Sequence, residues 1–215
     1  MDALVKNLEG RYIVIDGPDG TGKSTQLGLL RARLEQAGGT VDTVIDPGGT
    51  GVGQEIRKIL LHAKDLHLAP MCETFLFMAS RAQLVAEKVR PAQAEGKIVL
   101  GDRFISATLA YQGALGVDTN RILALGDQAV EGTWPDLTIL LDLPIEEGMI
   151  RVGKQRDRME SRTLEYQNEV RRRFATLGSE ENPYPHPVVH LDAAGTRENV
   201  HERIVQALKG HFANA

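Results

Sequence analysis

The chain has 215 residues, 42% of them hydrophobic, so it is long enough for one good core and too short for two. Its formal net charge of −4 argues against general affinity for nucleic acid or anionic membranes and favours small phosphate compounds as partners. Cys72 stands alone, which excludes an intrachain disulfide, and no segment resembles a signal peptide or could cross a bilayer. We expect one domain over residues 1–215 in a soluble, cytoplasmic protein.

Short apolar runs alternate with helical segments along the chain. We expect strands at Tyr12–Asp16, Val41–Ile45, Lys97–Gly101, Leu137–Asp142 and Val188–Leu191. We expect helices at Lys23–Gln36, Gly53–Leu61, Pro70–Arg90, Asn120–Glu131, Ile145–Lys154, Leu164–Leu177 and Thr196–Lys209. Pro91 should end or kink the third helix, and residues 182–187 should form a stiff surface connection. The alternation predicts an α/β fold, a five-stranded parallel sheet flanked by helices, with its ligand site beyond the carboxyl ends of the strands.

The most informative motif lies between the first strand and the first helix. It consists of Gly17, Pro18, Asp19, Gly20, Thr21, Gly22, Lys23, Ser24 and Thr25. This spacing is typical of a loop whose backbone N–H groups and following helix N-terminus bind phosphates. Lys23 would bridge the terminal phosphates and Ser24 would offer a hydroxyl to Mg²⁺. The motif favours a nucleoside triphosphate site over a glycine-rich turn without a ligand, because such a turn needs neither the lysine nor the hydroxyls.

Two acidic residues follow apolar strands and compete for the metal role. Asp102 and Arg103 come directly after one strand, at the sheet edge where the phosphate loop opens. Asp102 could hold Mg²⁺ and Arg103 could clamp a second phosphate, although a salt bridge at the strand end is the simpler alternative. Asp142 ends another strand in the same way. The sequence leaves the choice between Asp102 and Asp142 open.

A basic segment around Gly153 fits a small lid over the phosphates, at about residues 151–162. It contains Arg151, Lys154, Arg156 and Arg158. Phosphoryl transfer needs positive charge over the transferring group and exclusion of water. Without the phosphate loop, the same segment would be interpreted as a solvated helical face.

Phe77 and Arg81 lie four residues apart in a predicted helix and therefore share one face. The ring could stack on a nucleobase while the guanidinium donates to the acceptor edge of that base. From spacing alone, a core phenylalanine and a surface arginine would be the more common result.

The motifs also occur in a recognisable order along nearly the whole chain. They are Asp16–Thr25, Asp46–Thr50, Phe77–Arg81 with Gln83–Val85, Asp102–Phe104, Ala110–Gly113, Pro135–Thr138 with Leu141–Asp142, and Asp157–Glu160. This ordered set resembles the thymidylate kinase family. The resemblance implies a P-loop NTPase fold with a small mobile lid, homodimer formation, and phosphorylation of dTMP to dTDP with ATP and Mg²⁺.

The resemblance also implies roles for individual residues. Phe77 would stack on thymine, Arg81 would read its carbonyl edge, and Arg103 would clamp the acceptor phosphate. The residues that line the acceptor pocket would further include Asp19, Pro47, Thr108, Tyr111 and Gln112, with Tyr111 crowding the 2′-position of the sugar. The residues that would serve catalysis are Lys23, Arg103, Asp19, Arg156 and Arg158. The two lid arginines enter because Thr21 stands where some family members carry a catalytic arginine.

Several positions depart from the family pattern. Ile45-Asp46 replaces arginine-glutamate, Phe104 replaces tyrosine, Ala107 replaces serine, Asp16 replaces glutamate, and the lid is slightly shorter. These departures affect the expected catalytic rate and lid geometry more than they affect the resemblance to the family. Two alternatives remain, a kinase for another or several deoxynucleoside monophosphates, and a weakly catalytic paralogue. A GTPase switch is disfavoured, since no asparagine-lysine-x-aspartate motif is present.

Overall fold

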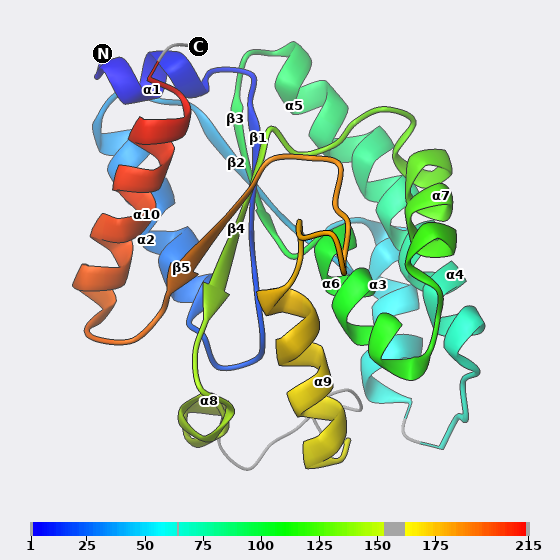
Figure 1. The fold of residues 1–215 in the computed structure, drawn as a ribbon. Helices are drawn as coiled ribbons and strands as arrows, with labels where there is room; N and C mark the ends of the chain where they lie inside the picture. Colours follow the sequence, from blue (N-terminus) through cyan, green and yellow to red (C-terminus); the bar gives the residue numbers. More distant parts are fainter. Residues whose placement is uncertain (1, 64, 153–161, 214–215) are drawn as a thin grey trace.

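A parallel sheet forms the centre of the fold. The computed structural model describes residues 2–63, 65–152 and 162–213. The strand order is β2-β3-β1-β4-β5, and all neighbouring pairs are parallel (Figure 1). The strands are β1 (Tyr12–Asp16), β2 (Val41–Ile45), β3 (Ile98–Asp102), β4 (Leu137–Asp142) and β5 (Val188–Asp192). The α/β fold predicted from the sequence is confirmed, and each strand begins and ends within one residue of its predicted position.

Helices cover both faces of this sheet. One face carries α1 (Ala3–Leu8), α2 (Lys23–Gln36) and α10 (Arg197–His211) (Figure 1). The other carries α3 (Gly51–Arg57), α4 (Pro70–Leu84), α5 (Arg90–Ala94), α6 (Ile105–Tyr111), α7 (Thr119–Val130) and α9 (Leu164–Ala175). The short turns are η1 (Lys58–His62), η2 (Val85–Val89) and η3 (Gly113–Leu115). Beyond the carboxyl ends of the strands lies α8 (Ile145–Val152) (Figure 1).

Strand β1 joins the two apolar layers. Ile13 and Ile15 belong to the cluster beneath α1, α2 and α10, whereas Tyr12 and Val14 belong to the cluster on the opposite face. All of them are fully buried, as the two-sided burial of a central parallel strand requires. The chain leaves this central strand at Asp16, so the phosphate loop begins at the middle of the sheet edge.

Two helices of the described residues, α1 and α6, were not expected from the sequence. Helix α1 is short, and the side chain of Asp2 caps it by accepting a hydrogen bond from the backbone N–H of Leu4. Helix α6 contains isoleucine, threonine and tyrosine, which favour strands, and no side chain caps its start at Phe104. Burial of nearly all its residues between neighbouring helices stabilises α6 instead.

The helix that begins at Pro70 does not end at Pro91, which leaves a kink as the part of the prediction that stays open. It continues from α4 through η2 and then through α5 to Ala94. Proline lacks an N–H and crowds the preceding turn of a helix. Here the wider π-helical turn η2 stands immediately before α5, and a turn of this kind accommodates the missing hydrogen bond.

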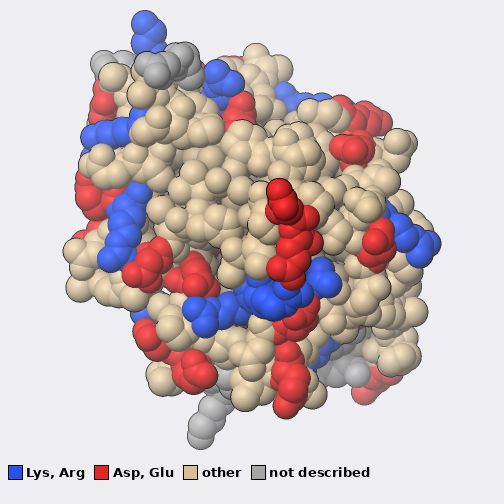
Figure 2. All heavy atoms as spheres, viewed as in Figure 1, with Lys and Arg blue, Asp and Glu red and all other residues tan. Residues whose placement is uncertain are grey.

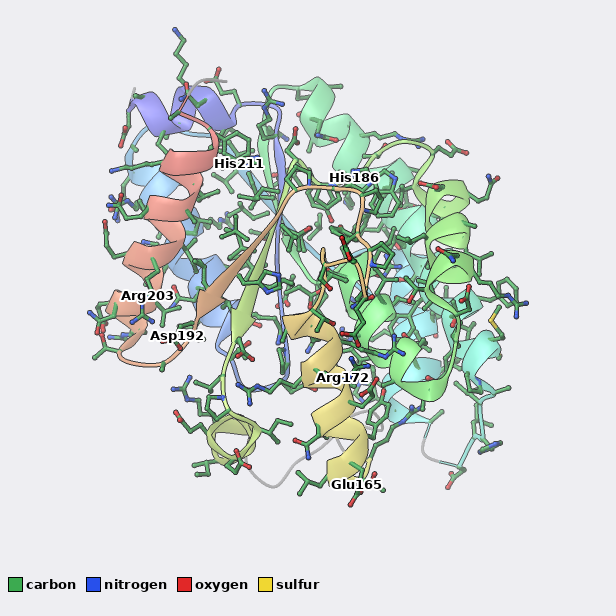
Figure 3. The ribbon with its side chains drawn as sticks, in the orientation of Figure 1. Glu165, Arg172, His186, Asp192, Arg203 and His211 are labelled. Carbon is green, nitrogen blue, oxygen red and sulfur yellow. The ribbon has the colours of Figure 1, made fainter. Side chains whose placement is uncertain are left out.

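The proline-rich connection at residues 182–187 packs inward more than a surface loop would. Asn182 and Tyr184 are buried, and the hydroxyl of Tyr184 lies 3.3 Å from the hydroxyl of Thr138 on β4. The ring of His186 stacks on Trp134 with 4.1 Å between ring centres, at the end of the sheet away from α8 (Figure 3). The connection therefore fixes the entry into β5.

Charges of both signs mix on the surface. Figure 2 shows a band of Lys and Arg side chains interspersed with Asp and Glu. On α9, Arg172 and Arg173 both pair with Glu169.

Among the described residues, no helix combines the length and apolar character needed to span a membrane.

Candidate nucleotide site

A cavity of about 390 Å³ opens at the carboxyl edge of the sheet. It is continuous from the phosphate loop to a pocket between α4 and α6. Its lining residues are Asp19, Gly20, Gly22, Lys23, Ser24, Thr25, Ile45, Asp46, Pro47, Arg57, Leu61, Phe77, Arg81, Asp102, Arg103, Ala107, Thr108, Tyr111 and Gln112. The structure thus brings together residues from five of the sequence motifs, which span residues 19 to 112 of the chain.

The phosphate loop joins β1 to α2 and is held by tight backbone packing. Gly17 has a φ of 135°, and a Cβ at this position would lie 2.2 Å from the carbonyl oxygen of Leu141. Lys23 folds back over the loop and donates from Nζ to the carbonyl oxygens of Gly17 (3.0 Å) and Pro18 (2.7 Å). Burial, together with the nearby Arg103 charge, lowers the pKa of Lys23 to about 8.

Helix α8 touches the same loop through a pair of glycines. A Cβ on Gly20 would lie 2.2 Å from the carbonyl oxygen of Gly148, and a Cβ on Gly148 would lie 2.6 Å from the carbonyl oxygen of Asp19. The two backbones are therefore in direct contact, and neither position has room for a side chain. This contact holds α8 against the phosphate loop, and the last two residues of α8 are the first two of the predicted lid segment.

Arg103 connects the end of β3 to the phosphate loop. Its φ of 67° is left-handed, which is uncommon for a residue with a side chain and is found often at functional sites. Its guanidinium donates to Oδ1 of Asp16 (3.3 Å), to the carbonyl oxygen of Gly17 (3.1 Å) and to Oδ1 of Asp19. It also lies 5.2 Å from the ring centre of Tyr111. Arg103 is thus fixed where it can reach a phosphate bound beside the loop.

The pKa values of Asp16 and Asp19 shift in opposite directions beside Arg103. Burial is the largest influence on Asp16 and raises its pKa, although Arg103 opposes it and Ser106 donates a 2.5 Å hydrogen bond to its Oδ2. Burial also acts on Asp19, but the charges of Arg103 and Lys23 outweigh it and lower the pKa of Asp19. The hydroxyl of Tyr111 donates to Oδ2 of Asp19 at 2.8 Å. The same two cations therefore lower the pKa of Asp19 but do not offset the effect of burial at Asp16.

A second pocket lies between α4 and α6, with Phe77 and Arg81 on its α4 side. Arg81 is only 1% exposed and donates from Nε to Oδ2 of Asp46 at 2.7 Å and from Nη2 to the carbonyl oxygen of Phe104 at 3.0 Å. Burial raises the pKa of Asp46 despite the Arg81 charge. The third nitrogen, Nη1, contacts only the sulfur of Met78 at 3.3 Å among the described residues. Arg81 is thus a buried, fixed cation rather than the surface side chain that helical spacing alone would give.

The sequence left open whether Asp102 or Asp142 would bind the metal ion, and the structure distinguishes them. Asp102 lines the cavity, and its Oδ2 accepts a 2.8 Å hydrogen bond from the hydroxyl of Ser24. Asp142 instead accepts two hydrogen bonds of 2.9 Å from Arg171 of α9. A hydroxyl beside a single carboxylate suits Mg²⁺, which binds through one or two protein oxygens together with substrate phosphates. Ser24 and Asp102 therefore fit this ion, and Asp142 does not line the cavity.

Most of the predicted site residues meet in this one cavity. Of the phosphate loop, Gly17, Pro18 and Thr21 lie behind the lining residues, and the hydroxyl of Thr21 donates to the carbonyl oxygen of Pro18 at 3.0 Å. Arg156 and Arg158, predicted to belong to the lid, lie outside the described residues.

Sequence reasoning missed three charged residues at the site. Arg57 lines the cavity and donates to the carbonyl oxygen of Pro47 at 2.7 Å. Glu73 is buried behind the second pocket, where Arg162 pairs with it at 2.6 Å. The spacing of Glu73 to Phe77 and Arg81, four and eight residues, was the one signal that could have indicated Glu73.

The fold and the loop define a P-loop NTPase with a second pocket facing its phosphate site. The Thymidylate kinase family model matches residues 15–204. A thymidylate kinase of Maridesulfovibrio salexigens is 38% identical, covering 94% of this chain and 98% of its own length. One of Rhodopirellula baltica is 44% identical, covering 91% and 78%. The crystal structure of thymidylate kinase from Ehrlichia chaffeensis has a TM-score of 0.74 at 28% identity and covers 94% of this chain and 99% of that one. The chain belongs to the thymidylate kinase family.

Proposed function

We infer that this protein transfers the γ-phosphoryl group of ATP directly to the phosphate of dTMP and forms ADP and dTDP. One observation carries this inference. A single cavity joins Lys23 and Ser24 of the phosphate loop to Phe77 and Arg81 of the second pocket. Both substrates can therefore be held in one continuous cavity, which direct transfer between them requires.

Catalysis in this site rests on positioning and positive charge, because phosphoryl transfer needs little covalent help from a protein. Lys23 would exchange the loop carbonyls for donor phosphate oxygens. Arg103, already fixed beside Asp19, would hold the acceptor phosphate. Tyr111 lies with its hydroxyl on Asp19 and would limit the space beside the sugar, so we expect deoxynucleotides to be preferred. The lid arginines Arg156 and Arg158 remain a prediction from the sequence.

Ser24 and Asp102 are the residues that would hold Mg²⁺. When bound, the ion would neutralise charge on the donor phosphates. The hydrogen bond from Ser24 to Asp102 keeps both oxygens at the mouth of the loop. Asp102 would accept from a water on the ion or contact the ion itself.

The thymine would lie between Phe77 and the end of α6. Phe77 is 9% exposed and lines the cavity, so its ring is within reach of a base bound there. Arg81 offers Nη1 to a carbonyl oxygen of the base, since its other two nitrogens are already bound to Asp46 and Phe104. Thr108 and Gln112 complete the lining on α6 and just after it.

The assay that tests this function measures ADP formed from Mg²⁺-ATP with each deoxynucleoside monophosphate and with no acceptor. Turnover that depends on dTMP and exceeds that with other acceptors supports the proposal. Equal turnover with several acceptors would replace it with a broad-specificity kinase, and binding of both nucleotides without product would indicate a weakly catalytic paralogue. ADP release without any acceptor would indicate an ATPase.

We also propose that residues 1–215 act as one domain in a cytoplasmic homodimer. Val52 of α3 and Phe75 of α4 are 50% and 54% exposed, and these two helices pack together. Two large apolar side chains on adjacent helices favour a protein partner at this surface. The molar mass from light scattering should be twice that of the chain, and Phe75→Lys should reduce it to that of a monomer. A monomeric unmodified protein would contradict the proposal.

A further inference from the structure

Glu73 is a fully buried acid that lies directly behind the second pocket. It precedes Phe77 and Arg81 by four and eight residues on α4, so all three side chains project from one face of the helix. Its exposed fraction is 0%. A carboxylate in such a place is costly unless it is hydrogen-bonded or paired with a cation.

Two described residues on different elements donate to Glu73. Gln112, at the end of α6, donates from Nε2 to Oε2 of Glu73 at 3.1 Å. Arg162, just before α9, donates from Nη2 to Oε1 at 2.6 Å. The Arg162 guanidinium also lies 4.8 Å from the ring centre of Tyr166, whose hydroxyl donates to the backbone carbonyl of Tyr111 at 3.0 Å. Glu73 therefore joins the wall of the acceptor pocket to the start of α9.

The contact with Glu73 fixes which end of the Gln112 amide faces the cavity. An ionised carboxylate only accepts hydrogen bonds, so the amide nitrogen must face Glu73 and the carbonyl oxygen, Oε1, must face away from it. Gln112 lines the cavity, and Oε1 accepts no hydrogen bond from the described part of the chain. Gln112 is thus held as a hydrogen-bond acceptor for a ligand.

We propose that Glu73 is a positioning residue that sets the hydrogen-bond polarity of the base pocket and so favours thymine over cytosine. The inference rests on the proposed function and deepens it. Thymine has a donor at N3, which suits the carbonyl oxygen of Gln112. Cytosine has an acceptor at N3, and two facing acceptors leave a buried polar group without a partner. Arg162 also requires an accepting oxygen on Glu73, because a guanidinium only donates hydrogen bonds.

The substitution Glu73→Gln should reverse this polarity. Its new amide has one accepting and one donating end. Arg162 needs the accepting end, so the donating end must face Gln112, which responds by turning its own carbonyl oxygen toward the new NH₂ group. Gln112 then presents its amide nitrogen to the base, and this nitrogen suits N3 of cytosine.

The experiment compares the dissociation constants of dTMP and dCMP by isothermal titration calorimetry. We expect the preference for dTMP over dCMP to fall about tenfold or more in Glu73→Gln, because one mismatched buried hydrogen bond has an effect of this order. The double variant E73Q/R162M should recover the preference, since without Arg162 the new amide can turn its accepting end toward Gln112. Glu87→Gln, the same change at an exposed position of η2, is the matched control and should leave the preference unchanged.

Each outcome bears on the proposal. Equal weakening of both ligands in Glu73→Gln, with the ratio unchanged, would show a merely structural role and overturn the inference. The same holds if E73Q/R162M fails to recover the ratio. If Glu73→Gln does not fold, Glu73→Leu replaces it, and a preference equal to that of the unchanged protein overturns the inference. Failure of the function itself looks different, because the unchanged protein would then bind dTMP without phosphorylating it.

Discussion

Lys23 changes its surroundings when phosphates bind, and the change should be measurable as proton uptake. In the structure its ammonium is buried against the carbonyl oxygens of Gly17 and Pro18, and its pKa is lowered to about 8. Phosphate oxygens carry more negative charge than these carbonyls and would raise the pKa again. Binding of ATP near pH 8 should therefore take up a proton from solution.

The size of the uptake follows from the pKa of the free protein. With a pKa of about 8 and a higher value in the complex, uptake is about 0.1 proton per ATP at pH 7, about 0.5 at pH 8 and about 0.9 at pH 9. The complex binds more protons than the free protein does, so rising pH disfavours it. Well above pH 8, the Kd for ATP should rise by about tenfold per pH unit until the pKa of the complex is reached.

Titration calorimetry in pairs of buffers with different ionisation enthalpies measures this uptake at each pH. The control is Lys23→Arg, because a guanidinium stays protonated throughout this range and should show no uptake from this position. Uptake that does not change between pH 7 and 9, or that persists unchanged in Lys23→Arg, would refute the reasoning.

Three further substitutions test other parts of the site. Arg103→Ala should lower turnover by about 10³-fold or more, and a nearly normal steady-state rate would contradict its role as a phosphate clamp. Arg81→Leu should destabilise the protein by about 3–5 kcal/mol in urea denaturation, because it leaves the buried Asp46 carboxylate without its cation, and an unchanged midpoint would contradict this. Asp102→Asn should raise the Mg²⁺ concentration needed for half-maximal rate by about 10-fold to 100-fold, and no change would remove Asp102 from the metal site.

The strands and the phosphate loop could be predicted from the sequence because local patterns determine them. The continuous apolar run of β1 marks a strand buried on both faces, and the glycines after it mark the loop. Helix α6 could not be predicted in this way. Its composition is mixed, with strand-favouring and helix-favouring residues side by side, and its helical form depends on packing between segments that are distant in sequence.

In the candidate site, too, local patterns predicted some residues, whereas others depend on contacts between distant segments. The motifs indicated Lys23 and Arg81, but the sequence could not choose between Asp102 and Asp142, because both end apolar strands. The difference arises from α9, which returns to the sheet edge and brings Arg171 to Asp142. Such a contact depends on how two distant elements pack, and no local spacing reveals it. Glu73 escaped notice for the same reason, since its partners come from other elements.

The contact between Gly20 and Gly148 also determines how motion can pass through this protein. A side chain between two segments can rotate or compress, and so absorb part of a displacement. These two backbones meet with no side chain between them. When a bound phosphate group shifts the loop by a fraction of an ångström, α8 must shift with it, because neither Gly20 nor Gly148 has a side chain that could absorb the displacement. The phosphate loop and α8 should therefore move together as one rigid unit.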